Sequence, residues 1–345
     1  MKIRIDRELQ RLTRRNVEAS FTYQYFGKNV NINISSDNGL KFNNNFDSFH
    51  NVGFIKNKNN YNLFYQIWLQ DKDKPLVVFF HGSAENSSTH PLFVFNALSK
   101  GYNVISFDQE GYGSSDGIRG TFRNNDDYIQ NTKLIIDKSE LLYKEKFNKM
   151  PSYIFTGSSA GCAILLYFYL KIKPENVIKI FLFSPYLKIH KRVINPIANK
   201  IIGIVKFKSF PLMREDSQRL IYENDQDNYL NMNKNISDNK HFLINRFKDT
   251  RIHRINSLKW LSAIIRKQNF IYYYSIKKKH ECFNIPVYCF ISENDLIVDN
   301  KRTFNFMKNI GQKKNLFRQA GFSHEFLEYQ DKRGEMFYTL LNLFL

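Results

Sequence analysis

The pentapeptide GSSAG at positions 157–161 places Ser159 between two glycines in the pattern G-x-S-x-G. The stretch Ser152 to Thr156 before it is rich in aromatic and β-branched residues and predicts a strand, and the run AGCAILLYFYLK after it predicts a helix. A strand, a sharp turn and a helix in this order expose the serine as a nucleophile. The simpler interpretation is that Ser159 only caps the helix. The flanking elements favour the nucleophile.

A serine hydroxyl is a weak nucleophile at neutral pH and needs a base, which in turn needs an orienting group. The apolar run PVYCFI predicts a buried strand, and Asp295 follows it by a few residues. Residues 315–319 predict a last strand, and His324 follows that one. We therefore expect Ser159 to be the nucleophile, His324 its base and Asp295 the acid that orients the base. Along the chain the acid and then the histidine follow the serine.

Cleavage of a carbonyl compound also requires hydrogen-bond donors for the oxyanion that forms. The apolar strand Leu76 to Phe80 ends in the sequence HGSA, where a backbone turn can direct an amide. We predict that the amides of Ser83 and Ala160 form this pair, each typically worth about 3 to 4 kcal/mol of barrier. His81 is expected to hold the loop rather than to act as a second base.

Two other aspartates compete with Asp295, because an acidic residue after a strand often only forms a turn. These alternatives are Asp299 and Asp108. The three cysteines show no C-x-x-C pair and no histidines at metal-ligand spacing, so we predict neither a metal nor an organic cofactor.

Taken together, these stretches resemble the α/β-hydrolase superfamily. Within it they are most similar to the monoacylglycerol lipases and the bacterial lysophospholipases of the L2 type. The resemblance extends from about residue 62 to 345 and rests on HGSAEN at His81, FDQEGYGSSDGIRG at Phe107, GSSAG at Gly157, PVYCFISENDLIVDN at Pro286 and FSHEFL at Phe322. It assigns the nucleophile to Ser159, the acid to Asp295 and the base to His324, and the oxyanion amides to Ser83 and Ala160.

The resemblance also implies the fold, which is of the α/β class. We expect a mostly parallel eight-stranded sheet with helices on both faces and a helical cap insertion. The core would comprise residues 47–187 and 286–345, and the basic cap insertion residues 188–285. Residues 1–46 would form an N-terminal arm, either amphipathic or disordered, and the sequence leaves its order open.

The formal net charge of +19 is unevenly spread. Residues 188–285 carry 20 Lys and Arg against 8 Asp and Glu, together with apolar stretches such as Ile201 to Val205. Such a segment could cover an acyl chain and meet anionic headgroups, so we expect peripheral contact with an anionic membrane. The alternative is an ordinary solvated basic surface. No nucleic-acid motif accompanies the charge, and no nucleic-acid partner is expected.

Three cysteines make no disulfide framework, which is typical of a reducing compartment. The N-terminal residues MKIRIDRELQRLTRRN contain no apolar signal region, and no run of 18 apolar residues occurs. We therefore predict a cytoplasmic protein that can bind the inner face of a membrane.

The expected activity is hydrolysis of the carboxylic ester of a single-chain lipid, lysophospholipid or monoacylglycerol, through an acyl-enzyme. One alternative is acyl transfer, or cleavage of another ester, a thioester or a peptide, by the same three residues. An alternative of another class is a non-catalytic module that binds a lipid or a partner.

Overall fold

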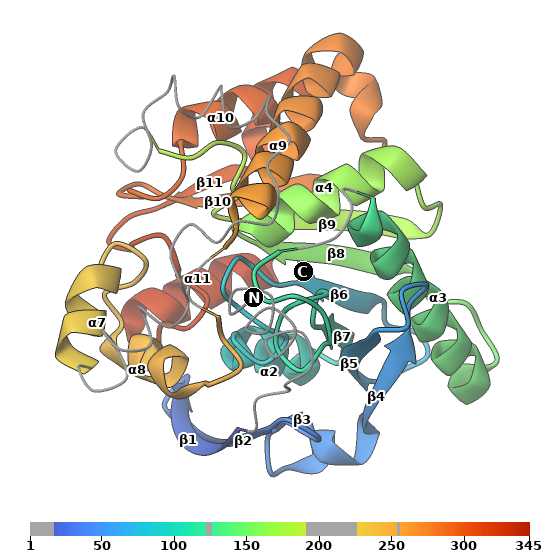
Figure 1. The fold of residues 1–345 in the computed structure, drawn as a ribbon, viewed down its shortest axis with the longest axis vertical. Helices are drawn as coiled ribbons and strands as arrows, with labels where there is room; N and C mark the ends of the chain where they lie inside the picture. The colour runs from blue at the N-terminus through green and yellow to red at the C-terminus, as the bar shows by residue number, and fades with distance from the viewer. Residues whose placement is uncertain (1–16, 122–125, 191–225, 254–255) are drawn as a thin grey trace, which may run out of the picture.

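A central sheet of eight strands organises the molecule (Figure 1). The computed structural model describes residues 17–121, 126–190, 226–253 and 256–345. The strand order across the sheet is β11-β10-β9-β8-β6-β7-β5-β4. The strands are β4 (His50–Lys56), β5 (Asn62–Trp68), β6 (Leu76–Phe80), β7 (Asn103–Phe107), β8 (Tyr153–Ser158), β9 (Val177–Phe183), β10 (Val287–Ser292) and β11 (Leu316–Gln319).

The six strands from β6 to β11 run parallel to one another, whereas β5 pairs antiparallel with β7 and with β4. Strands β6 and β7 are buried along their whole length, as expected for parallel strands covered on both faces. The prediction of a mostly parallel eight-stranded sheet is therefore confirmed.

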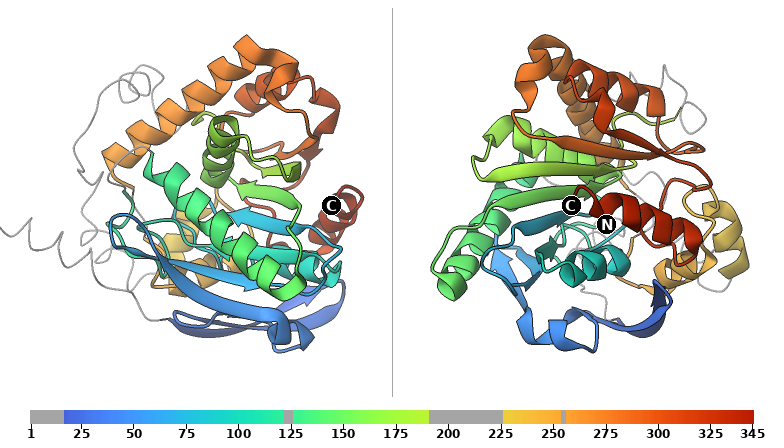
Figure 2. Two further views of the ribbon diagram at one scale, coloured as in Figure 1. Left: turned by 90° about the vertical axis from the view of Figure 1, so that its right-hand side faces the viewer. Right: turned by 180° about the vertical axis from the view of Figure 1, so that it is seen from behind.

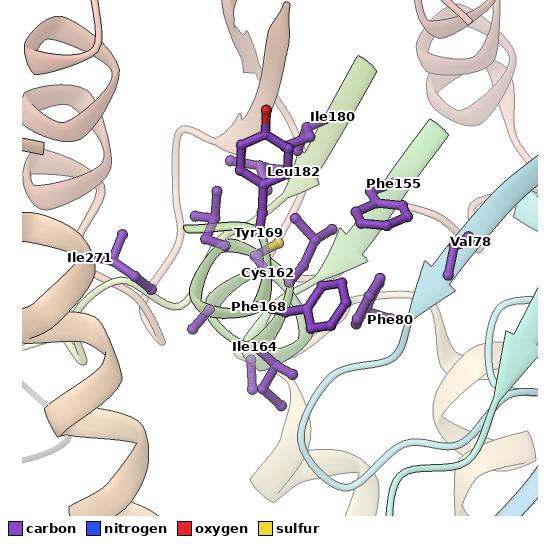
Figure 3. Close-up of a cluster of buried hydrophobic side chains, with 14 of the residues drawn as sticks. Val78, Phe80, Phe155, Cys162, Ile164, Phe168, Tyr169, Ile180, Leu182 and Ile271 are labelled. Carbon is purple, nitrogen blue, oxygen red and sulfur yellow. The ribbon is translucent and has the colours of Figure 1, made fainter. Parts of the chain in front are cut away.

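Helices cover both faces of the sheet (Figure 2). The larger hydrophobic cluster lies between one face and the helices α3 (Asp127–Phe147), α4 (Ala160–Ile172), α9 (Leu258–Lys278) and α10 (Asn300–Asn309). Figure 3 shows part of it, where Phe155 and Phe168 lie near Phe80. The second cluster contains α2 (Pro91–Ser99) and α11 (Lys332–Asn342) on the other face.

The N-terminal residues form a second, antiparallel sheet of three strands, β1 (Glu18–Tyr25), β2 (Lys28–Ser35) and β3 (Gly39–Lys41). Alternate residues of β2, including Ile32, are buried in the second hydrophobic cluster together with Tyr23 and Leu40. Short 3-10 turns occur at η1 (Asn45–Phe49), η2 (Lys279–Cys282) and η3 (Lys313–Asn315). The sequence left the order of residues 1–46 open, and from residue 17 onward the structure describes these residues as the small sheet and the start of η1.

The segment predicted as a cap contributes three described helices, α7 (Gln226–Asn233), α8 (Lys240–Lys248) and α9. Helices α7 and α8 share a small cluster of Tyr229, Phe242 and Leu243. Helix α9 packs on α4 within the main core. The apolar stretch 201–205 lies outside the described residues, and the boundaries 188–285 stay a prediction.

The basic residues of this segment do not all face solvent. Arg246, Arg251 and Lys267 are buried, and the two arginines contact Glu85 and Asp249 respectively. The exposed lysines 277–279 end α9, where the chain turns into η2 and then β10. They therefore lie at the amino edge of the sheet, opposite the edge where the strands end. In the described parts of the chain, no helix is long and apolar enough to cross a membrane.

Candidate active site

Ser159 occupies the sharp turn between β8 and α4. Its backbone is strained, with φ of +49° and ψ of −116°, a region that non-glycine residues rarely adopt. The turn is anchored to the strand beside it, because the Ser159 amide donates to the Phe183 carbonyl at 2.9 Å and the Tyr186 amide donates to the Ser159 carbonyl at 3.0 Å. The hydroxyl is thus presented at the carboxyl edge of the sheet.

The glycines on either side of the turn allow this close approach. A Cβ at Gly161 would lie 2.1 Å from the Phe80 carbonyl oxygen and 2.6 Å from that of His81. A Cβ at Gly157 would lie 2.9 Å from the Cys162 amide nitrogen. Gly161 is therefore required by the packing of α4 against the end of β6, and Gly157 by the tight turn from β8 into α4.

We predict that Gly161→Ala lowers the free energy of unfolding by about 2 to 3 kcal/mol, because the backbone of β6 must move to accept the methyl group. Denaturant unfolding measures the loss. Gly27→Ala is the control, since φ is +74° there and a Cβ meets nothing within 4 Å. That variant should lose only about 1 kcal/mol from backbone strain. Equal losses in the two variants would contradict the packing argument.

The structure brings Asp295, His324 and Ser159 into one hydrogen-bond chain. His324 Nε2 lies 2.9 Å from Ser159 Oγ, and His324 Nδ1 lies 2.7 Å from Asp295 Oδ2. The other carboxylate oxygen of Asp295 accepts from the amides of Ile297 at 2.8 Å and Val298 at 2.9 Å. Both carboxylate oxygens of the acid are thereby held in place by hydrogen bonds.

The two competing aspartates have other contacts. Asp299 is the N-cap of α10 and contacts Lys188 Nζ at 2.9 Å. Asp108 accepts from the amides of Ser87 and Ser114, each at 2.6 Å. Neither aspartate is hydrogen-bonded to His324, so the geometry favours Asp295 as its partner.

Burial and charge act in opposite directions on the pair. Burial alone would raise the pKa of Asp295 and lower that of His324. Burial is the largest single effect on each group, but the attraction between the carboxylate and the imidazolium together with the hydrogen bonds to the pair outweighs it. The pKa of Asp295 is therefore lowered and that of His324 is raised from their usual values of 3.8 and 6.5.

The raised pKa of His324 has a consequence for the pH profile. Because only the neutral imidazole can accept the serine proton, kcat/KM should fall about tenfold per pH unit on the acid side, with a midpoint above 6.5. Initial rates on a soluble ester between pH 5 and 9 measure this limb. A midpoint well below 6.5 would contradict the ion pair.

Two serines that the sequence analysis did not single out hold the loop between β11 and α11, which we call the histidine loop (residues 320–331). Ser184 Oγ donates to the His324 carbonyl and Ser292 Oγ donates to the Phe322 carbonyl, each at 2.5 Å. Both serines lie where a parallel strand ends. Their residue type alone carries no signal that separates them from other loop serines.

The predicted oxyanion donors lie at the ends of β6 and β8. Ala160 is the first residue of α4, so its amide has no partner within the helix. Ser83 lies in the loop of residues 81–85, which we call the oxyanion loop. Asn256, which the sequence analysis also missed, donates from Nδ2 to Ser83 Oγ at 2.5 Å and accepts from the Tyr112 hydroxyl at 3.1 Å.

His81 is fully buried and both of its ring nitrogens have partners. Nδ1 lies 2.8 Å from the Gly82 carbonyl, and Nε2 accepts from the Gln109 amide at 3.1 Å. The ring therefore joins the oxyanion loop to the loop after β7. Cys162, Cys282 and Cys289 are buried thiols, and no group of three metal-ligating side chains occurs in the described ranges.

A mostly parallel sheet with a serine at a strand-to-helix elbow, and an acid and a histidine after later strands, defines an α/β-hydrolase. Residues 71–331 match the Hydrolase_4 family, described as serine aminopeptidase, S33. The chain belongs to this family of serine hydrolases.

Solved structures with the same fold include two lipases of one class. Monoacylglycerol lipase of Paleococcus ferrophilus is 18% identical, with a TM-score of 0.60 over 81% of this chain and 96% of that one. A soluble variant of monoglyceride lipase from Saccharomyces cerevisiae, in complex with a substrate analog, is 15% identical, with a TM-score of 0.66 over 85% and 93%. A putative aryl esterase from Burkholderia cenocepacia is 12% identical, with a TM-score of 0.56 over 85% and 98%.

A curated relative gives a shorter match. An uncharacterized abhydrolase domain-containing protein of Dictyostelium discoideum is 29% identical over 119 residues, which is 34% of this chain. The match spans 12% of that relative's length.

Proposed function

We propose that the chain hydrolyses the carboxylic ester of a single-chain lipid, lysophospholipid or monoacylglycerol, through an acyl-enzyme. The observation that carries the proposal is the hydrogen-bond chain from Asp295 through His324 to Ser159. A histidine oriented on one side by a carboxylate and facing a strained serine on the other is the arrangement that activates a hydroxyl.

In the first step, His324 takes the proton of Ser159 as the oxygen attacks the ester carbonyl. The amides of Ser83 and Ala160 donate to the oxyanion. Collapse of the intermediate breaks the ester bond, and His324 returns the proton to the leaving alcohol. In the second step a water molecule, deprotonated by the same imidazole, releases the fatty acid and restores Ser159.

The lipid ester as substrate is supported by the sequence resemblance and by neighbours named as monoacylglycerol lipases. The family description instead names an aminopeptidase, which is the alternative that needs a direct comparison. Purified protein should therefore be offered lysophospholipid, monoacylglycerol, a short soluble ester and an aminoacyl amide. Release of fatty acid from neither lipid would reject the lipid substrate, and added acceptor alcohols would reveal acyl transfer by the ester they form.

The nucleophile can be tested without choosing a substrate. We expect a fluorophosphonate to add once to the native chain and not to Ser159→Ala, as measured by intact mass. Absence of the adduct from the native chain would reject an activated Ser159 and favour the non-catalytic binding module.

We propose further that the basic segment 188–285 contacts an anionic membrane surface. Lysines 277, 278 and 279 form a consecutive run of exposed charge within it, and about 1 kcal/mol per lysine is available near such a surface. Ser159→Ala protein should cosediment with vesicles that contain anionic lipid, and less so at higher salt. Replacing all three lysines with glutamate should abolish the binding, and binding to neutral vesicles of equal strength would reject the role.

A further inference from the structure

Three glutamates and a histidine gather in the interior beside the histidine loop, and the mechanism above uses none of them. Glu85 ends the oxyanion loop, His90 precedes α2, and Glu325 and Glu328 follow His324 in the histidine loop. Each exposes 6% or less of its surface. We call these four residues the carboxylate cluster.

Glu85 fastens the oxyanion loop. Its Oε2 accepts from the Gly82 amide at 2.6 Å and lies 3.1 Å from His90 Nε2, while Oε1 lies 3.5 Å from Arg246 Nη1 of α8. Burial opposes ionisation of this carboxyl, but the His90 imidazole, the Arg246 guanidinium and the Gly82 amide lower its pKa to about 2. Glu85 is therefore the ionised member of the cluster.

The other side of His90 faces the histidine loop. His90 Nδ1 lies 3.8 Å from Glu325 Oε1 and 3.8 Å from Glu328 Oε1. Glu325 Oε1 accepts from the Leu327 and Glu328 amides, and Glu328 Oε1 accepts from the Leu92 amide at the start of α2. One imidazole thus stands between the oxyanion loop and the loop that carries His324.

The charges around this imidazole do not balance unless a carboxyl is protonated. Within the described ranges, His90 Nδ1 and the second oxygens of Glu325 and Glu328 have no hydrogen-bond partner. An ionised carboxylate with one oxygen unpartnered is costly in the interior, because that oxygen loses its hydration without gaining a donor or a cation. Burial raises the pKa of Glu325 to about 7, and burial with the nearby Glu325 raises that of Glu328 well above its usual range.

We propose that one proton, held where His90 meets Glu325 and Glu328, ties the histidine loop to the oxyanion loop, and that these side chains are positioning residues for the hydrolase site. The inference rests on the proposed serine-hydrolase function. When that proton leaves, like charges oppose one another at the junction, and the two loops separate. Activity then declines on the alkaline side of the profile.

The remaining groups that face the cluster do not replace this proton. Burial raises the pKa of the Tyr23 phenol on β1 and of the Tyr338 phenol on α11 well above 10, so both stay neutral. The charged and titratable neighbours of Glu325 and Glu328 are Glu85, His90, Arg246, His324, Tyr23 and Tyr338.

The test compares rates of fluorophosphonate labelling between pH 6 and 10 for the native chain and for Glu328→Gln. The glutamine keeps an oxygen for the Leu92 amide and carries N–H groups at every pH. We expect the alkaline midpoint to move upward by at least one pH unit in the variant, so that labelling of the variant is about twofold faster at the native midpoint and approaches tenfold faster at pH values above both midpoints. Glu145→Gln, an exposed change on α3, is the matched control and should leave the profile unchanged.

Hydrogen exchange supplies a structural readout of the same event. After correction for the intrinsic rate, peptides covering 81–90 and 322–329 should both exchange faster above the native midpoint, and not in Glu328→Gln. If thermal unfolding shows that this variant does not fold, Glu325→Gln takes its place with the same expectation.

A native profile that stays flat to pH 10, or an alkaline midpoint and loop exchange that the variant leaves unmoved, would overturn the inference. Absence of labelling at every pH would instead reject the proposed function, and the exchange comparison would then decide the inference alone.

Discussion

Ser159→Ala should lower kcat on any accepted ester by roughly 10⁴- to 10⁶-fold, the largest effect expected from a single substitution in this chain. The reason is that no other hydroxyl is hydrogen-bonded to His324 Nε2 in the described part of the chain. The residual rate over water would come from the oxyanion amides and from binding. Steady-state rates on a soluble ester, with titration of active sites by fluorophosphonate, measure the loss.

Ser158→Ala is the matched control, because it removes a hydroxyl from the neighbouring residue of the same turn. Ser158 is the last residue of β8 and is buried, so its side chain cannot take the place of Ser159 at the edge of the sheet. We expect its kcat to stay within a few-fold of the native value. A loss in Ser158→Ala comparable with that in Ser159→Ala would show that damage to the turn, rather than loss of the nucleophile, lowers the rate.

Asp295→Asn should lower kcat by about 10⁴-fold while leaving the fold intact. The carboxylate accepts the Nδ1 proton of His324 and so leaves Nε2 free to accept the proton of Ser159. An asparagine side chain can donate to Nδ1 instead, which moves the ring proton to Nε2 and blocks the transfer. The same variant should lose the acid-side midpoint above 6.5, since the charge that raises the pKa of His324 is gone.

Asp299→Asn distinguishes this effect from general damage to the loop. Asp299 caps α10 by accepting from the Lys301 and Arg302 amides, and asparagine caps a helix almost as well. The contact with Lys188 is partly exposed and is worth at most about 1 kcal/mol. We expect kcat to change less than twofold, and a large loss here with none in Asp295→Asn would reverse the assignment of the acid.

Local patterns were sufficient to predict several strands of the central sheet, whereas the eight-stranded, mostly parallel arrangement was implied by the family resemblance. The run LVVFF at β6 is apolar at every position, as a strand covered on both faces must be, and β6 is buried throughout. The helix predicted from the run AGCAILLYFYLK is α4, which begins at Ala160 as predicted and ends at Ile172, one residue beyond the run. The small N-terminal sheet was missed, although β1 and β2 span eight residues each and Val30, Ile32 and Ile34 alternate along β2 and are buried. The asparagines between these apolar residues are uncommon in strands and concealed the pattern.

The sequence by itself determined the class of chemistry, since the residue types and their order along the chain identify Ser159, Asp295 and His324 as candidates. The strand-to-helix elbow is formed by residues that are neighbours in the chain, so it can be predicted from the two glycines around Ser159 and from the patterns of the flanking strand and helix. An acid and a histidine follow later strands in the chain. Because parallel strands end at one edge of the sheet, the chain order alone predicts that these two residues lie near Ser159.

Only the tertiary structure decided which aspartate meets the histidine and what holds the site together. Asp295 and Asp299 lie four residues apart after the same strand. The fold of the loop brings the carboxylate of Asp295 to His324, whereas Asp299 caps α10. Glu85, Arg246 and Glu328 are distant in the chain and look like ordinary surface residues. They meet around His90 because α8 and the histidine loop pack against the oxyanion loop, and such long-range burial leaves no periodic trace in a single sequence.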